Sequence, residues 1–330
     1  MHRTIFPQAP IASPFHAAST AADVMADIRL DGKHAIVTGG YSGLGLEMVR
    51  SLARAGAQVT VPARDLARAR QALDDEPNVI VDALDLADPA SIDAFAGRCL
   101  AMRRPLHLLI NSAGVMATPF ARDPRGVEWQ FAVNHLGHFR LTAALWPALL
   151  EAGDARVVSM SSRGHQLAPV DFDDVSFVRR PYDKWIAYGQ SKTANALFAV
   201  GLDRRGRAAG VRAFSVHPGS VLGPLARHLT PEEIAAFGVH DADGGLVVAP
   251  ERDLKTPAQG AATALWCATS PLLQGVGGLY CEDCNIARLA EDGETGRSGV
   301  RPWATDPVQA ERLWALSEQL AGKFGARPLT

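Results

Sequence analysis

The sequence predicts an α/β protein in which helices cover both faces of a doubly wound parallel sheet. Short apolar runs alternate with helical patterns from residue 33 onward, an order typical of a parallel sheet buried between helices. The chain has 330 residues, of which 47% are hydrophobic and 21% charged, so it can bury a large core and is not a disordered chain. Glycines cluster directly after the first predicted strand, where the backbone must turn sharply into a helix. We expect a single domain, although this length would also allow two.

Each predicted strand is a short apolar run bounded by turn residues, and each predicted helix repeats its apolar residues every three to four positions. The strands are predicted at residues 34–37, 58–62, 79–84, 106–110, 156–160, 212–216 and 278–281. The helices are predicted at residues 44–55, 65–73, 91–102, 128–150, 187–204 and 259–268.

The predicted domain covers residues 29–290, between an N-terminal extension at 1–28 and a C-terminal tail with one helix at 291–330. Two inserts interrupt the alternation, at residues 163–186 and at residues 223–256, and the second is rich in proline, glycine and acidic residues. Long loops in a compact domain are usually functional or mobile. In an open α/β sheet, the loops at the carboxyl ends of the strands surround the ligand.

Charge and composition exclude several classes of protein. The chain has 33 basic and 35 acidic residues, which gives no electrostatic signature of binding to nucleic acid or to an anionic membrane. No apolar stretch is long enough to span a membrane, and the N-terminus lacks the apolar core of a secretory signal, so we expect a cytoplasmic protein. The excess of arginine over lysine is typical of a GC-rich, bacterial genome.

Four cysteines do not form a disulfide framework. Cys281 and Cys284 form one C-x-x-C, without a second pair at the spacing of a zinc ribbon. We interpret them as two cysteines at the end of a strand, with a metal or redox pair as the alternative, and we expect no metal site.

The glycine cluster, residues 38–45, reads Thr-Gly-Gly-Tyr-Ser-Gly-Leu-Gly between the first strand and the first helix. Glycines at 39, 43 and 45 allow a tight turn and let a pyrophosphate approach the backbone at the start of a helix. A purely structural turn is the alternative. The strand–turn–helix context favours a dinucleotide site.

The second predicted strand is followed by Ala63-Arg64. A carboxylate at this point would hold the ribose 2′-hydroxyl of NAD, whereas an arginine accommodates the 2′-phosphate of NADP. We therefore expect NADP(H) rather than NAD(H). The alternative is that Arg64 is one more surface arginine.

Tyr188 and Lys192 lie four residues apart on a predicted helix and therefore share one face. A nearby cation favours the phenolate and should lower the tyrosine pKa toward neutrality. Such a tyrosine can exchange a proton with a carbonyl or alcohol oxygen. Ser161 and Ser162 follow the strand at 156–160, where a hydroxyl can bond a substrate oxygen, although serines at strand ends are also common caps.

These motifs, in this order, resemble the short-chain dehydrogenase/reductase family over roughly residues 31–290, which implies a Rossmann-type fold. The subgroup of retinol dehydrogenases, WW-domain oxidoreductase and protochlorophyllide reductase is most similar. The segments that carry this resemblance are N-H-L-G-H-F at 134–139, S-S-R-G-H at 161–165 and Y-G-Q-S-K-T-A-N-A-L-F at 188–198. We expect neither a WW domain nor a membrane anchor.

The resemblance implies a catalytic tetrad of Asn134, Ser162, Tyr188 and Lys192, with Ser161 as the second choice of serine. Tyr188 would be the acid or base, and Ser162 would hold the substrate oxygen. Lys192 would lower the Tyr188 pKa and bind the cofactor ribose, and Asn134 would position a water that relays protons. The implied cofactor contacts are Gly39, Tyr41, Ser42, Gly43, Leu44, Gly45, Arg64, Asp85, Leu86, Asn111, Ala113, Gly114, Tyr188, Lys192, Pro218, Gly219 and Val221.

Two positions depart from the family pattern. Ser112 stands where the second asparagine of N-N-A-G is usual, and Gly223 stands where P-G-x-x-x-T has threonine. The glycine removes a hydroxyl that would contact the cofactor. Neither change touches the proton-transfer residues.

The expected function is hydride transfer between NADP(H) and a small alcohol or carbonyl compound, without nucleic acid. The resemblance implies a homodimer or homotetramer that uses the helix at 188–204. Apolar side chains in the two inserts suggest a lipophilic substrate, unless they pack on their own loops: Phe172, Phe177, Trp185, Leu222, Leu225, Leu229, Ile234 and Phe237. A silent NADP(H)-binding sensor of the same fold is the alternative, and the glycine spacing disfavours a nucleotide-sugar epimerase. We interpret His135, His138 and His165 as packing or capping residues.

Overall fold

The structure is a computed structural model that describes residues 6–241, 243–291, 293–294 and 296–322. Its centre is one eight-stranded sheet with the order β3-β2-β1-β4-β5-β6-β7-β8, and only the β7–β8 pair is antiparallel. The strands are β1 (His34–Val37), β2 (Gln58–Ala63), β3 (Val79–Ala83), β4 (Leu108–Asn111), β5 (Ala155–Met160), β6 (Val211–Val216), β7 (Leu279–Glu282) and β8 (Asn285–Ile286). The order 3-2-1-4-5-6 is that of a doubly wound dinucleotide-binding sheet, so the predicted fold class is confirmed.

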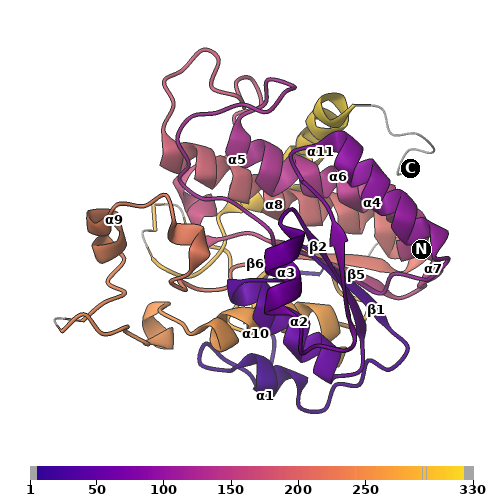
Figure 1. Cartoon of the computed structure of the whole chain (residues 1–330). Helices are drawn as coiled ribbons and strands as arrows, with labels where there is room; N and C mark the ends of the chain where they lie inside the picture. The colour runs from indigo at the N-terminus through magenta and orange to yellow at the C-terminus, as the bar shows by residue number, and fades with distance from the viewer. Residues whose placement is uncertain (1–5, 242, 292, 295, 323–330) are drawn as a thin grey trace.

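Helices cover both faces of the sheet, as Figure 1 shows. One layer contains α4 (Pro89–Ala101), α6 (Gly137–Ala144), α8 (Lys184–Gly206) and α11 (Pro307–Ala321), and the other contains α1 (Ala21–Met25), α2 (Gly43–Arg54) and α10 (Pro257–Thr269). The shorter helices are α3 (Leu66–Ala72), α5 (Trp129–Phe131), α7 (Trp146–Glu151) and α9 (Pro231–Ala236). A separate apolar core fills the space between each layer and the sheet.

The helix predicted at 128–150 is not continuous in the structure. A π-helical turn, Ala132–Leu136, separates α5 from α6, and α7 starts anew at Trp146. Pro147 lies in the first turn of α7, where its missing N–H costs nothing, whereas inside a continuous helix it would break a hydrogen bond. The prediction of one long helix was therefore wrong. The π-turn carries Asn134, and π-turns often mark functional sites.

The predicted N-terminal extension packs against the domain from residue 6 onward. Helix α1 buries Ala21, Val24 and Met25 and packs on α10 and α2. Near the start of the chain, the side-chain amide of Gln8 bonds the backbone of Tyr280 in β7. The segment therefore packs against two helices and bonds the strand β7.

The C-terminal tail forms α11, which packs along α8 and α6. Trp314 of α11 is buried and stacks against Phe198 of α8, with ring centroids 6.1 Å apart. The chain's own helix thus covers this part of α8, the helix that the resemblance implies in subunit contacts.

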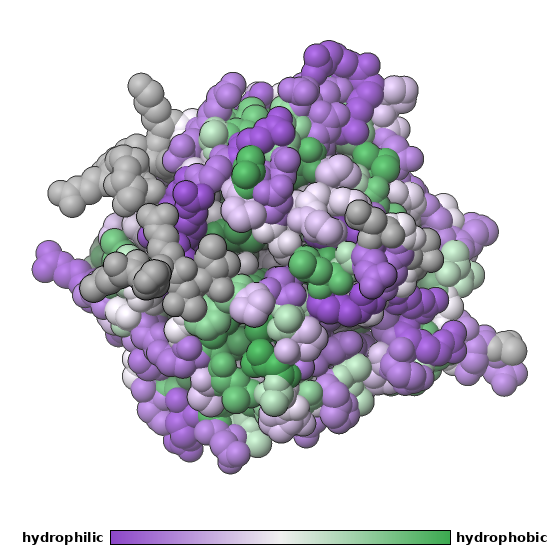
Figure 2. Space-filling view, turned by 180° about the vertical axis from the view of Figure 1, so that it is seen from behind, coloured by the Kyte–Doolittle hydropathy of each residue, from purple (hydrophilic) through white to green (hydrophobic). Residues whose placement is uncertain are grey.

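Two further expectations concern the cysteine pair and the absence of a membrane-spanning helix. Cys281 lies in β7 and Cys284 in the turn that follows, and both are buried free thiols. Within the described residues, no helix combines the length and the apolar character needed to cross a membrane. Figure 2 shows hydrophilic residues over much of the face seen from behind, with hydrophobic residues gathered toward its middle.

Candidate active site

A cleft of about 1530 Å³ opens at the carboxyl ends of the parallel strands, the edge at which α/β sheets bind ligands. Its walls include most of the predicted site residues: Gly39, Tyr41, Ser42, Gly43, Leu44, Gly45, Arg64, Asp85, Leu86, Ala113, Gly114, Ser162, Tyr188, Lys192, Pro218, Gly219 and Val221. Two predicted residues, Asn111 and Asn134, are buried and do not line it. Asn111 ends β4 and donates its side-chain N–H to Thr142 Oγ1 at 3.2 Å.

The glycine turn is packed so closely that only glycine fits at two of its positions. A Cβ on Gly45 would lie 2.2 Å from the Gly39 carbonyl oxygen, and one on Gly39 would lie 2.9 Å from the Ala113 Cα. Gly39 and Gly43 also have positive φ angles, 68° and 51°, which glycine adopts without strain. The close backbone contacts and the positive φ angles therefore require glycine in this turn.

Helix α2 begins at this turn without a side-chain cap. Its N-cap residue, Ser42, makes no capping hydrogen bond in the described part of the chain. The first N–H groups of a helix need an acceptor and carry partial positive charge, so this end of α2 fits a pyrophosphate. Gly39, Gly43 and Gly45 leave room for such a group to reach the backbone.

A buried histidine connects the glycine turn with the π-turn. Thr38 Oγ1 accepts hydrogen bonds from the N–H groups of Ser112 and Ala113, at 2.9 and 3.0 Å. Its own proton therefore goes to His138 Nε2, 2.9 Å away. His138 must then carry its proton on Nδ1, which donates to the Asn134 carbonyl at 3.0 Å. Burial lowers the pKa of His138 to about 4, which keeps this neutral form.

The Asn134 side chain clamps the loop after β4. Its amide accepts from Val115 N–H at 2.8 Å and donates to the Val115 carbonyl and to Ser191 Oγ, both at 2.9 Å. A Cβ on Gly114 would lie 3.1 Å from Asn134 Oδ1 and 3.7 Å from Lys192 Nζ. Asn134 is thus next to the lysine, and its side chain bonds the loop after β4 and Ser191.

Ser162 and Tyr188 meet at the floor of the cleft. Ser162 caps a 3₁₀ turn, Arg163–Leu167, by accepting the Gly164 N–H at 3.0 Å, and its side chain also bonds Tyr188. The tyrosine ring packs so close to Gly164 that a Cβ there would lie 2.6 Å from it. Ser161 instead donates its hydroxyl to the Lys192 carbonyl at 2.7 Å. The two serines therefore have different roles in the structure, and Ser162 is the one bonded to Tyr188.

The pKa of Tyr188 differs from the value expected from its spacing to Lys192. Burial raises the pKa of Tyr188 to about 12, and the Ser162 hydrogen bond only partly offsets this. Burial also lowers the pKa of Lys192 to about 8, and its ammonium donates to the Met160 carbonyl at 3.0 Å. The expected lowering of the Tyr188 pKa is therefore wrong for the chain as it stands in this structure, because loss of water disfavours both charged forms.

Two arginines lie where the ribose end of a dinucleotide would be expected. Arg64 directly follows β2, and Arg68 lies one turn farther along in α3; both line the cleft. Asp65, the acid between them, caps α3 by accepting the Arg68 N–H at 3.0 Å. Sequence reasoning found Arg64 and missed Arg68, although their spacing of four residues was a usable signal.

The outer part of the cleft is apolar and comes from the inserts. Of the eight predicted apolar residues, Phe172 and Phe177 do not line it. The others do: Trp185, Leu222, Leu225, Leu229, Ile234 and Phe237. Sequence reasoning missed further apolar wall residues, two of them in the inserts (Leu167 and Val239) and three elsewhere (Met116, Trp129 and Val133).

Helix α9, on the long excursion at the left of Figure 1, closes over the start of α8. Lys184 Nζ lies 2.6 Å from Glu233 Oε1. Trp185 contacts both Phe237 and Tyr188, with ring centroids 6.1 and 6.5 Å apart. The insert therefore contacts α8 one turn before Tyr188.

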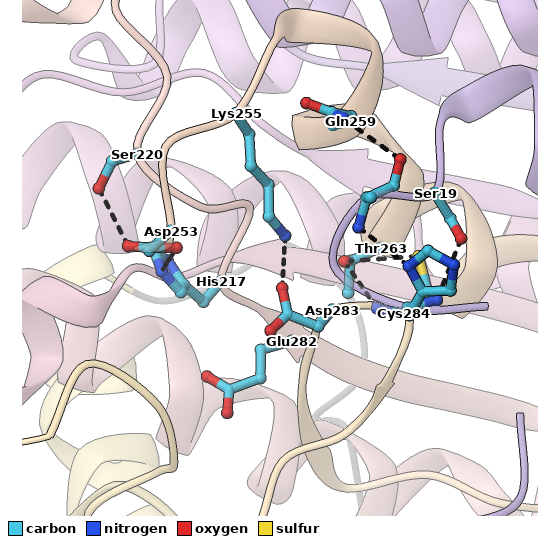
Figure 3. A network of polar contacts seen from close by, with 12 residues as sticks. Ser19, His217, Ser220, Asp253, Lys255, Gln259, Thr263, Glu282, Asp283 and Cys284 are labelled. Carbon is cyan, nitrogen blue, oxygen red and sulfur yellow. Dashed lines mark hydrogen bonds and ion pairs between the residues drawn. The ribbon is translucent and has the colours of Figure 1, made fainter. Parts of the chain in front are cut away.

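A polar network supports the Pro218-Gly219 loop, as Figure 3 shows. Arg163 N–H donates to His217 Nδ1 at 3.1 Å, and His217 Nε2 then donates to Asp253 at 3.0 Å. Burial opposes ionisation of Asp253, but His217 and Arg163 hold the pKa of its carboxyl at about 2. Asp253 lies 36 residues after His217, so no local pattern could have revealed the pair.

A second ion pair lies beside this loop. Lys255, whose side chain is buried, binds Asp283 in the turn between β7 and β8 (Figure 3). A Cβ on Gly219, whose φ is 87°, would lie 2.6 Å from the Lys255 chain. Glycine is therefore needed for the loop to rest on this lysine.

Comparison with known proteins agrees with this geometry. The short chain dehydrogenase family model matches residues 33–234. A Streptomyces lividans protein named "Probable oxidoreductase" is 48% identical over 291 residues, covering 86% of this chain and 96% of the relative. Retinol dehydrogenase 12 of Mus musculus is 37% identical over 307 residues, covering 90% of this chain and 88% of the relative.

Solved structures show the same fold. A crystal structure of a Mycobacterium paratuberculosis protein superposes with a TM-score of 0.70 at 34% identity, covering 92% of this chain and 97% of that one. The RhlG/NADP complex of Pseudomonas aeruginosa, at 21% identity and a TM-score of 0.60, covers 77% of this chain and 95% of that one, and it supports the fold alone. This chain belongs to the short-chain dehydrogenase/reductase family of oxidoreductases, and its similarity is to the retinol dehydrogenase-like subgroup.

Proposed function

We propose that this protein is a cytoplasmic, NADP(H)-preferring oxidoreductase that interconverts an alcohol and a ketone or aldehyde on a lipophilic small molecule. One observation carries the proposal: Ser162, Tyr188 and Lys192 meet in a cleft with a glycine turn on one side and an apolar insert on the other. Such a cleft can hold a dinucleotide and an apolar substrate with their reacting ends at the tyrosine.

When bound, the nicotinamide cofactor supplies or accepts the hydride. Tyr188 donates its phenolic proton to the substrate oxygen in reduction and removes it in oxidation. Its raised pKa keeps it protonated at neutral pH, which suits the reductive direction. Ser162 holds the same oxygen and polarises the carbonyl, and Lys192 binds the ribose and stabilises the phenolate that forms.

Asn134 contributes to the proton relay through its backbone. Both N–H donors of its side-chain amide are used by Val115 and Ser191, and one lone pair of its backbone carbonyl accepts from the His138 ring. A carbonyl oxygen has two lone pairs, so the second can hold a water beside Lys192. This water would return protons to the lysine.

Preference for NADP(H) rests on Arg64 and Arg68, which both line the cleft after β2. A guanidinium binds a 2′-phosphate through charge-assisted hydrogen bonds. The backbone cradle around Gly39 and the uncapped start of α2 support the pyrophosphate. Ser112, one departure from the family pattern, donates only its backbone N–H to Thr38, so the serine side chain does not disturb the cradle.

A lipophilic substrate is favoured by the side chains that line the outer cleft, which include Trp185, Leu229 and Phe237. Pockets lined mainly by apolar groups with a few polar ones bind largely apolar small molecules. Any assembly of subunits would use faces other than the part of α8 that α11 covers.

The test is a panel of retinoid, steroid and aromatic ketones and alcohols, with NADPH and with NADH, followed by the absorbance of the reduced nicotinamide. We expect turnover of at least one apolar carbonyl compound and a preference for NADPH. Tight NADPH binding with no turnover of any member would favour the silent sensor, and a clear preference for NADH would overturn the cofactor assignment.

A further inference from the structure

We propose that the two terminal segments of this chain position Ser162 for the reaction, through a relay of contacts from Gln8 to Tyr280 and His165. The proposal rests on the function above, because it assigns Ser162 a catalytic contact. Gln8 and Tyr280 lie outside residues 33–234, the part that matches the family model. The relay would therefore join segments outside the family model to the site within it.

The first step of the relay joins His165 to Ser162. His165 is completely buried, and its Nε2 lies 3.1 Å from the backbone N of Arg301, in the C-terminal segment. Because a backbone N–H can only donate, Nε2 must accept, and the ring proton is on Nδ1. Nδ1 lies 2.7 Å from the Ser162 carbonyl oxygen, so His165 donates to it and holds the backbone of Ser162.

The His165 backbone is itself held from two sides. Its carbonyl accepts a hydrogen bond from Trp303 Nε1 at 3.3 Å and lies 3.1 Å from Thr193 Oγ1, whose hydroxyl proton goes to the nearer Ala168 carbonyl at 2.7 Å. Thr193 follows Lys192 on α8, and Trp303 belongs to the C-terminal segment. The His165 carbonyl thus lies between α8 and the tail, while its ring bonds Ser162 and, in the tail, Arg301.

The second step joins Tyr280 of β7 to the serine doublet. The Tyr280 ring packs on His165 with centroids 4.8 Å apart, and its hydroxyl lies 3.2 Å from His165 Nδ1. The same hydroxyl bonds the side chain of Ser161, whose own proton goes to the Lys192 carbonyl at 2.7 Å. Tyr280 therefore supports the histidine that holds Ser162, and it also braces the helix that carries Lys192.

The third step joins the N-terminal segment to Tyr280. Gln8 Oε1 accepts the Tyr280 N–H at 3.0 Å, and Gln8 Nε2 donates to the carbonyl oxygens of Tyr280 and Ala287, at 2.8 and 2.6 Å. One side chain thus holds the backbone of Tyr280 from both sides of its Cα. These contacts span 272 residues of sequence and fix the position of the ring that packs on His165.

The test uses two substitutions of His165 that separate its two ring contacts. In His165→Asn, the side-chain amide nitrogen takes the place of Nδ1 and can still donate to Ser162, while the acceptor for Arg301 is lost. In His165→Gln, the amide group is one bond farther out, so it can reach Arg301 but not replace Nδ1. If His165 positions Ser162, His165→Gln should lower kcat roughly 10- to 100-fold, because a displacement of about 1 Å near a reacting group costs up to ~10²-fold. His165→Asn should keep most of the wild-type kcat.

The N-terminal end of the relay is tested by Gln8→Ala, with Val24→Ala as the matched control. Val24 lies in the same N-terminal segment and is 5% exposed, so its truncation loosens the packing of α1 without touching Tyr280. We expect Gln8→Ala to lower kcat severalfold with an unchanged Kd for NADPH, and Val24→Ala to lower Tm with an unchanged kcat. Wild-type kcat in both Gln8→Ala and His165→Gln would overturn the relay.

Failure of the relay and failure of the proposed function give different results. If the wild-type protein turns over no substrate, the function fails. The relay is then decided by the carbonyl carbon NMR signal of Ser162, which reports the hydrogen bond from His165. A shift of that signal in Gln8→Ala but not in Val24→Ala supports the relay, and an unchanged signal in both contradicts it.

Discussion

The two walls of the cleft are built in different ways. The cofactor wall, formed by the glycine turn and the ends of β2, β3 and β4, is mainly backbone, and at Gly45 and Gly39 it leaves no space for a side chain. The substrate wall, formed mainly by the two inserts, is lined largely by apolar side chains, and the ion pairs Lys184–Glu233 and Arg163–Asp253 join the two inserts. The comparison predicts that the cofactor wall is intolerant of substitution at its glycines, whereas the substrate wall can change without loss of the fold.

The largest expected effect is at the junction of the walls. Tyr188→Phe removes the proton donor and keeps the ring that packs on Gly164, so turnover should fall by about 10²–10⁴-fold with NADPH binding retained. Steady-state kinetics and a binding titration of the same preparation measure the two quantities. Near-normal turnover would remove Tyr188 from the mechanism.

The rigidity of the cofactor wall is tested next. Gly45→Ala places a Cβ 2.2 Å from the Gly39 carbonyl oxygen, so the turn must open and NADPH affinity should fall by at least about 10-fold, which corresponds to about 1.4 kcal/mol. Gly97→Ala in α4 is the control, because a Cβ there meets nothing within 4 Å and alanine stabilises a helix by up to about 1 kcal/mol over glycine. Equal NADPH affinity in the two variants would show that the wall is not rigid.

The cofactor wall should also discriminate between NADPH and NADH. Arg64→Leu removes one charged contact to a 2′-phosphate, which is worth about 1.5–3 kcal/mol, so NADPH affinity should fall while NADH affinity stays the same. Arg70→Leu, in α3 but outside the cleft, should change neither affinity. A parallel loss of both cofactors in Arg64→Leu would mean that Arg64 does not read the phosphate.

On the substrate wall we expect smaller effects. Glu233→Gln breaks the ion pair with Lys184. Both side chains are partly exposed, so the ion pair contributes only about 0–1 kcal/mol to stability. The KM for an apolar substrate should therefore rise by no more than about fivefold, with little change in NADPH affinity. Glu232→Gln on the same helix is the control. A large loss of kcat in Glu233→Gln would show that the substrate wall is as demanding as the cofactor wall.

The last expected effect is a gain in NADPH affinity. Gly223 has an extended backbone, with φ at −172°, and a Cβ there meets nothing within 4 Å. Gly223→Thr should therefore fit without strain and can restore the hydroxyl of the family pattern, a hydrogen bond worth about 0.5–1.5 kcal/mol. Isothermal titration with NADPH measures it, and weaker binding would mean that the loop needs the glycine.

The sequence alone determined the order of strands and helices, the glycine turn, Arg64 and the Tyr188–Lys192 pair. Each of these is a local pattern, because hydrophobic period, turn glycines and residues on one helical turn are properties of neighbouring positions. The predicted strands and most of the predicted helices agree with the structure to within a few residues for the same reason.

The tertiary structure alone decided which serine bonds Tyr188, that Asn111 faces the core, and that the pKa of Tyr188 is raised. It also decided the contacts of His217 with Asp253 and of Gln8 with Tyr280, which lie 36 and 272 residues apart. Burial and long-range hydrogen bonds depend on how the whole chain packs, and no local pattern encodes them. The segment at 128–150 combines the two cases. Its apolar period was visible in the sequence, whereas its π-turn at Asn134 was not.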